Sequence, residues 1–159
     1  MNIIRKIRSF CKLDTKMKRL LIEAYIALGW ARYRKSKEFS KIAPSLGEHM
    51  VETTYDSNVH NMAMLRNISS SIQKMSRYTF WESECLVKAM AGMKMLERRG
   101  IESTLYLGTG RDETGLIAHA WLRSGNFYIS GVNGMEKFTV VAMFANKNSI
   151  VNFEREYSG

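Results

Sequence analysis

Two side chains in this sequence have the chemistry of a nucleophile and its base, namely Cys85 and His119. Thr79 to Glu82 matches the S/T-x-x-E pattern that begins many helices, and Ser83 is an alternative N-cap. Cys85 is therefore predicted in the first one or two turns of a helix, where unpaired amides and the helix dipole favour a thiolate. Considered alone, a cysteine that simply packs a helix is the commoner interpretation.

His119 lies in the segment LIAHAWLR, whose pattern is that of a strand. Alternation assigns one set of residues to the core face, Leu116, Ala118, Ala120 and Leu122, and a second set to the other face, Ile117, His119 and Trp121. A hydrogen-bonded structural histidine is the commoner role for such a residue by itself. Together, however, a thiol at a helix start and an imidazole on a later strand are two parts of a thiol hydrolase.

An imidazole base needs a third group, usually an Asp or Asn that accepts a hydrogen bond from its other ring nitrogen. A hairpin turn at Gly125 and Asn126 would return the following residues to the level of His119. The local polar candidates there are Asn133 and Ser130, and neither is acidic. We take Asn133 as the candidate for this role.

The elements that must position these residues follow from the hydrophobic pattern. Apolar residues recur at helical spacing in three segments, 17–33, 58–75 and 82–99. Pro44 and Gly47 predict a break after the first, and Gly100 ends the third. From Ile101 onward, short β-branched and aromatic runs separated by turn residues indicate antiparallel strands. Helices followed by a small antiparallel sheet predict an α+β fold.

The length of 159 residues predicts one domain. We divide it into a helical part, 1–76, a catalytic helix with the antiparallel sheet, 77–145, and a C-terminal tail, 146–159. Its 45% hydrophobic and 25% charged residues exclude wholesale disorder. The formal charge of +9 favours an anionic partner, which could be nucleic acid, lipid, or an acidic protein or peptide.

Several other features are weaker. The run GTGRDETG contains Asp112 and joins strand to strand, so it predicts a hairpin loop and not a phosphate-binding loop. His49 and His60 have no suitably spaced ligand partner, so we expect no metal. We also expect no cofactor. Nucleic-acid binding ranks last because the strands hold few cations, Arg111, Arg123 and Lys137.

The cysteines and the apolar segments bear on the compartment. Cys11 and Cys85 are far apart and form no CxxC pair, which favours a reduced, cytoplasmic setting. The segment MNIIRKIRSFCKL is basic, and charges interrupt its apolar runs before a signal-peptide core can form. The longest apolar stretch, Leu20 to Ala31, is too short to span a bilayer and contains Glu23, so a buried helix is predicted.

An ordered set of motifs runs from Tyr78 to Phe144: a Trp shortly before Cys-Leu, a helix ending in Leu and Arg-Arg-Gly, a strand ending in Leu-Gly, then His-Ala-Trp. Its members here are Trp81, Cys85, Leu86, Leu96, Arg98, Arg99, Gly100, Leu107, Gly108, His119, Ala120 and Trp121. This pattern resembles the stand-alone transglutaminase-like cysteine peptidases of lasso-peptide biosynthesis. The helix LLIEAYIALGWARY and the following IAPSLG extend the resemblance over most of residues 17–144.

The resemblance implies a transglutaminase-like, papain-like core with a Cys-His-Asp triad, in which Cys85 is the nucleophile and His119 the base. We also expect Trp81 and Trp121 to contact substrate. The position that is often acidic in this family is Gly131 here. The third role then passes to an Asn, to a backbone carbonyl or to a residue outside the hairpin, or the enzyme works as a dyad.

The implied function is removal of the leader peptide from a ribosomally made lasso-peptide precursor. The resemblance also implies a leader-binding partner protein that delivers the precursor and an ATP-dependent cyclase that acts on the product; this sequence contains no ATP motif of its own. The alternative is a non-catalytic transglutaminase-like module that binds peptide in the same kind of pathway.

Overall fold

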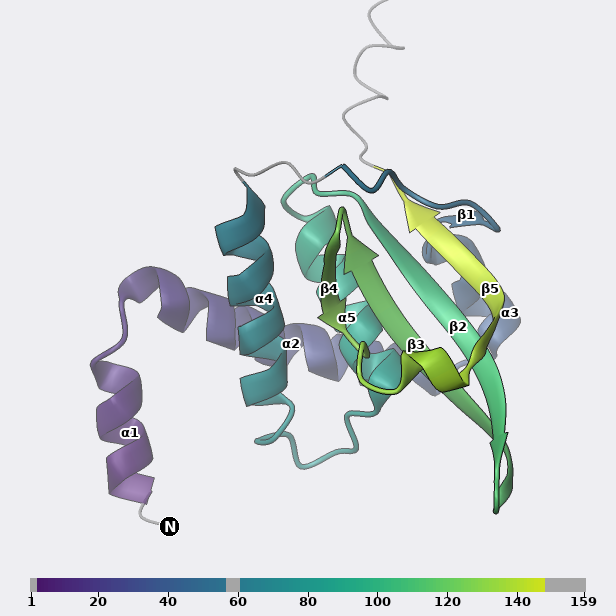
Figure 1. Cartoon of the computed structure of the whole chain (residues 1–159). Coiled ribbons are helices and arrows are strands. Elements are labelled where there is room, and N and C mark those ends of the chain that lie inside the picture. The colour runs from purple at the N-terminus through teal and green to yellow at the C-terminus, as the bar shows by residue number, and fades with distance from the viewer. Residues whose placement is uncertain (1–2, 57–60, 148–159) are drawn as a thin grey trace, which may run out of the picture.

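A computed structural model describes residues 3–56 and 61–147, and it shows helices stacked against one side of an antiparallel sheet (Figure 1). The helices are α1 Ile3–Cys11, α2 Thr15–Lys35, α3 Phe39–Ile42, α4 Met62–Met75 and α5 Cys85–Glu97, with short 3-10 turns at Ala43–Ser45 and Met135–Lys137. The strands are β1 Glu48–His49, β2 Ser103–Asp112, β3 Gly115–Ser124, β4 Phe127–Ser130 and β5 Thr139–Asn146, in the sheet order β1-β5-β2-β3-β4. The predicted α+β class is confirmed.

The apolar faces of the helices and of the sheet determine how the layers stack. Helices α4 and α5 pack on the sheet, and α2 packs on both of them from the far side. Gly92 in α5 allows the closest approach, since an added Cβ there would overlap Leu122 of β3. Leu105 pairs with Leu122 and Leu107 with Ala120, which places these four side chains on the face toward α5. The core therefore lies between this face and the helices.

The predicted helix start at residues 79–82 is wrong. Thr79 Oγ1 makes hydrogen bonds with the carbonyl oxygens of Ser76 and Trp81 and with Ser83 Oγ, so it ties the preceding loop together and caps no helix. The N-cap is Glu84, whose backbone is extended, and α5 begins at Cys85. The end is as predicted, because the chain turns at Gly100 with φ +65°.

Other expectations differ in detail. No helix is predicted over residues 3–11, where the structure has α1. Leu116 is 74% exposed and Ala118 is also exposed, so the core assignment of these two residues is wrong. They lie toward the free end of the β2–β3 hairpin, which extends beyond the helices in Figure 1. The expected hairpin turns are present, at residues 113–114 and at Gly125 and Asn126.

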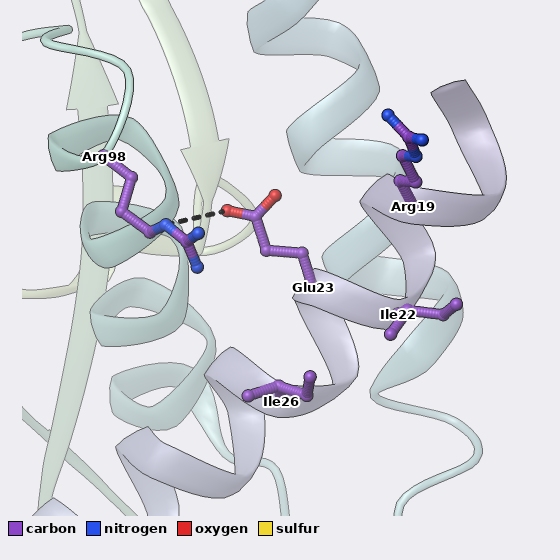
Figure 2. Close-up of a pocket in the computed structure, with 5 residues that line it drawn as sticks. All are labelled: Arg19, Ile22, Glu23, Ile26 and Arg98. Atoms are coloured by element: carbon purple, nitrogen blue, oxygen red, sulfur yellow. Dashed lines mark ion pairs between the residues drawn. The ribbon is translucent and has the colours of Figure 1, made fainter. Parts of the chain in front are cut away.

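Glu23 is the single acid in the apolar stretch of α2, and its partners are two arginines at the end of α5. Its carboxylate accepts two hydrogen bonds from Arg99, at 2.8 and 2.6 Å. Figure 2 shows it also pointing toward Arg98, whose Nε lies 3.8 Å away. The pair Arg98 and Arg99 thus joins the end of α5 to α2.

The predicted helix start at 58–60 and most of the predicted C-terminal tail, 148–159, lie outside the described residues. No helix within the described ranges is long and apolar enough to cross a membrane.

Candidate active site

Cys85 is the first residue of α5 and is half-buried against the edge of the core. The amides of the first helical turn have no acceptor within the helix, so they can donate to an anion. The other cysteine, Cys11, is exposed in α1. Position and surroundings therefore single out Cys85 as the candidate nucleophile.

The residue before Cys85 carries a charge that is neutralised. Glu84 forms an ion pair with Lys35 at the end of α2. The hydrogen bond from Lys35 lowers the pKa of the Glu84 carboxyl, so the pair stays charged at neutral pH. Because a free carboxylate here would oppose a neighbouring thiolate, Lys35 offsets that repulsion.

The ring of His119 has a defined hydrogen-bond partner. Its Nε2 lies 2.7 Å from the carbonyl oxygen of Gly131. A carbonyl can only accept, so Nε2 carries a proton when the ring is neutral. The lone pair of the neutral imidazole is therefore on Nδ1, the nitrogen left free to act as a base.

Gly131 occupies a position that excludes a side chain. Its φ is +76°, and an added Cβ would overlap the carbonyl oxygen of Ala120 and the backbone of Trp121. An Asp at this position would meet the same obstruction. Among the possibilities left open by the sequence, the structure shows a backbone carbonyl as the hydrogen-bond partner of His119.

Asn133, the sequence candidate for that partner, lies exposed in the following turn. Among the described residues no hydrogen bond involves its side chain, and Ser130 Oγ is buried and also has none. Asn133 thus lies two residues after Gly131, with no hydrogen bond to the His119 ring among the described residues.

Aromatic rings fix the plane of the imidazole. His119 stacks on Phe138, with centroids 4.9 Å apart, and on Trp121, with centroids 5.9 Å apart. Trp121 in turn stacks on Tyr106 at 5.5 Å. Only 5% of Trp121 is exposed, so in this structure it supports His119 and offers little surface to a substrate.

This aromatic stack rests on a buried cation that sequence reasoning missed. Arg123 is fully buried and donates from Nε to Tyr106 Oη at 2.9 Å. Its guanidinium lies 3.7 Å from the ring centroid of Tyr55 and also donates to the carbonyls of Thr53 and Thr54. Side chains alternate along β3, so Arg123 lies on the same face as His119 and Trp121. This alternation is the sequence signal that could have identified Arg123.

The hydroxyl of Tyr106 belongs to the same buried network. Its hydroxyl donates to Glu52 and accepts from Arg123. Desolvation raises the pKa of Tyr106, and the hydrogen bond to Glu52 raises it further. The neutral phenol is therefore the form that fits this network.

Trp81 packs inward. Its ring lies 5.3 Å from that of Tyr25 and faces Gly29, both in α2. The neighbouring Phe80 is 90% exposed and makes an edge contact with Trp81 at 4.5 Å. Phe80, which the sequence did not single out, is thus the most exposed aromatic residue in the loop before Cys85.

The two candidate catalytic residues belong to different layers. Helix α5 packs on the sheet face that carries Ala120 and Leu122, whereas His119 pairs with Gly108 on the other face. Strand β4 pairs with β3 only as far as Leu122, so β3 has no strand partner on that side at His119. No hydrogen bond joins Cys85 to His119 in the described part of the chain.

One cavity of the structure lies away from both Cys85 and His119. A cavity of about 330 Å³ lies along α2, and Figure 2 shows its lining, which includes Ile22, Ile26 and the ion pair of Glu23 with Arg98. Within residues 3–56 and 61–147, no three His, Cys, Asp or Glu side chains gather as a metal site would require. His49 packs on Phe144, and His60 lies outside the described residues.

Comparison with known proteins found a matching family model. The family model described as the transglutaminase-like superfamily matches residues 25–143, a range that includes Cys85, His119 and Gly131. No curated protein and no solved structure matches the chain.

Proposed function

Since this chain belongs to the transglutaminase-like superfamily, we propose that it is a cysteine peptidase that removes the leader from a ribosomally made lasso-peptide precursor. The observation that carries the catalytic part is the hydrogen bond from His119 Nε2 to Gly131, because it leaves Nδ1 as the base. The position of Cys85 at the start of α5 supplies the matching nucleophile.

The proposed reaction has two steps. His119 Nδ1 takes the proton of Cys85, and Sγ attacks the scissile carbonyl carbon, so that a C–S bond forms. The C–N bond then breaks as the imidazolium gives its proton to the leaving amine. Nδ1 next deprotonates a water, whose oxygen attacks the thioester, and the C–S bond breaks to return the thiolate.

The developing oxyanion would be held by backbone amides at the start of α5, including that of Cys85. Catalysis requires Cys85 Sγ and His119 Nδ1 within hydrogen-bond reach, whereas α5 packs on the sheet face opposite the one that carries His119. We propose that binding of the precursor brings the two together.

The partners follow from the family resemblance. A leader-binding protein would deliver the precursor, and an ATP-dependent cyclase would close the freed N-terminus onto an acidic side chain. The net charge of +9 suits an acidic leader or an acidic partner surface.

The first test is the reactivity of Cys85. The native protein is alkylated with limiting iodoacetamide from about pH 5 to about pH 9, and mass spectrometry follows Cys85 and Cys11 separately. We expect Cys85 to react faster than Cys11 at neutral pH, and His119→Ala to remove that difference. If Cys85 is inert, the same experiment is repeated with partner and precursor present.

The second test is cleavage of the precursor. Cys85→Ala should abolish cleavage while the fold and precursor binding persist, and Cys11→Ala should cleave as the wild type does. Full cleavage by Cys85→Ala contradicts the assignment. If Cys85 stays inert even with partner and precursor, the non-catalytic peptide-binding module is the correct interpretation.

A further inference from the structure

Helix α1 separates apolar and basic side chains. On a helix of 3.6 residues per turn, Ile4, Ile7 and Phe10 fall within one arc, and the cations Arg5, Lys6 and Arg8 lie outside it. The three apolar side chains are 70%, 57% and 39% exposed. The described part of the chain thus leaves a large apolar strip on α1 uncovered.

Helix α1 is held at the periphery of the molecule. Figure 1 shows it at one end of the molecule, away from the sheet. Its orientation is set by Lys6, whose Nζ lies 4.6 Å from the ring centroid of Tyr78, and by Lys18, which donates to the carbonyl of Cys11 at 2.9 Å. A flat surface can therefore reach α1 without meeting the sheet.

The apolar strip continues into a cavity. A largely apolar hollow of about 550 Å³ lies between α1 and the adjoining ends of α2 and α4. Its apolar lining is formed by Ile7, Phe10, Leu13, Leu21, Met75 and Tyr78. Lys6 and Lys74 also border the hollow, so ammonium groups stand beside apolar surface.

Charge is concentrated in the same region. Residues 1–22 contain seven of the 24 Lys and Arg and one of the 15 acids, Asp14. On α1 the cations flank both edges of the apolar arc, with Arg8 on one side and Lys6 on the other. Cations in this arrangement meet anionic headgroups when the apolar strip enters the interface.

We propose that α1 docks the protein on an anionic lipid surface, with Ile4, Ile7 and Phe10 at the acyl boundary and the surrounding cations on lipid phosphates. An anionic lipid surface fits the strip because α1 lies at the periphery and cations flank its apolar arc on both sides. This inference is independent of the peptidase assignment, since it uses none of the catalytic residues.

The test is cosedimentation of the full chain with vesicles. One set contains phosphatidylcholine alone, and the other contains about three parts phosphatidylcholine to one part phosphatidylglycerol. The protein should sediment with the anionic set and stay in solution with the neutral set. Raising NaCl from about 0.1 M to about 0.5 M should release it, because headgroup attraction is screened.

Two variants identify the surface. Ile4→Ser with Ile7→Ser removes two of the strip's three apolar side chains, and Arg5→Gln with Arg8→Gln removes positive charge beside it. Both variants alter exposed side chains, so circular dichroism and the melting temperature should not change. Each should lower partitioning into anionic vesicles by about tenfold. The matched control is Leu116→Ser with Arg111→Gln in the exposed β2–β3 hairpin, which should bind as the wild type does.

Three results overturn the proposal: no sedimentation with anionic vesicles, equal sedimentation with both sets, or unchanged binding by both α1 variants. The first result, no sedimentation with anionic vesicles, would indicate that an acidic protein and not a lipid surface covers the strip. Because none of these readouts involves peptide cleavage, failure here is distinguishable from failure of the peptidase assignment.

Discussion

His119 Nε2 is hydrogen-bonded to the backbone carbonyl of Gly131, at 2.7 Å, and not to an acidic side chain. A neutral carbonyl orients the imidazole and fixes its tautomer as a carboxylate would. It stabilises the imidazolium less, because it carries no full charge. The ring is therefore positioned mainly by this bond and by its stacking on Phe138 and Trp121.

Substitution of Gly131 should be far more costly than substitution of a nearby glycine. Gly131 and Gly134 have φ of +76° and +79°, but an added Cβ overlaps Ala120 at the first and meets nothing at the second. Gly131→Ala should lower the free energy of unfolding by about 3 kcal/mol or more, and Gly134→Ala by about 1 kcal/mol. Urea unfolding measures both, and equal losses would contradict the overlap.

Asn133 should contribute little to turnover. Its side chain is exposed and the ring of His119 is already bonded to Gly131. We expect Asn133→Ala to change kcat of precursor cleavage by less than about threefold. A loss of orders of magnitude, with the fold retained, would restore Asn133 as the orienting residue.

Lys35 should assist the thiol of Cys85. Removing its ammonium leaves Glu84 unpaired beside the nucleophile. Lys35→Met should slow alkylation of Cys85 at pH 7 by about three- to tenfold. Lys41→Met, which breaks the exposed pair with Glu38, is the matched control and should have no effect. Equal rates in the two variants would show that Lys35 has no such role.

Glu23 should make stability sensitive to acid. The hydrogen bonds from Arg99 lower the pKa of Glu23, so its contribution is present above the pKa of the unfolded chain and is lost as pH falls through the folded value. Glu23→Gln should lower the free energy of unfolding by about 1–3 kcal/mol at pH 7 and flatten its fall below about pH 4.5.

Urea unfolding between about pH 3 and pH 7 checks this. Glu97→Gln is the control, because Glu97 pairs with Lys94 at the surface and should matter little. An acid dependence that is the same in Glu23→Gln as in the wild type would show that another group is responsible.

Tyr106 should support Arg123 through its hydroxyl. Tyr106→Phe keeps the ring that stacks on Trp121 but leaves Arg123 Nε buried without its acceptor. The expected loss is about 1–3 kcal/mol of unfolding free energy, measured with urea. Tyr128→Phe, on β4, is the control and should be near neutral.

The same substitution has a pH signature. Since burial raises the pKa of Tyr106, the phenol ionises first in the unfolded chain. Its contribution is complete below the unfolded pKa and is lost as pH rises above about 10. Tyr106→Phe should therefore show a shallower alkaline loss than the wild type, and an unchanged slope would contradict the burial argument.

The sequence alone determined the elements that periodicity encodes. Helices near 17–33, 58–75 and 82–99 and the strands after Ile101 were predicted because apolar spacing is a local property of the chain. The same local pattern placed Cys85 at a helix start and His119 on a strand. It misplaced the start of α5, because Thr79 finds closer partners in its own loop.

Tertiary structure decided what surrounds these residues. The partner of His119 is a backbone atom, and a carbonyl leaves no signal in the sequence. Arg123 is buried because the segment holding Thr53 and Tyr55 crosses the sheet, and Leu116 is exposed because its end of the hairpin extends past the helices. Both outcomes depend on contacts between segments far apart in the chain, which alternation along one strand does not encode.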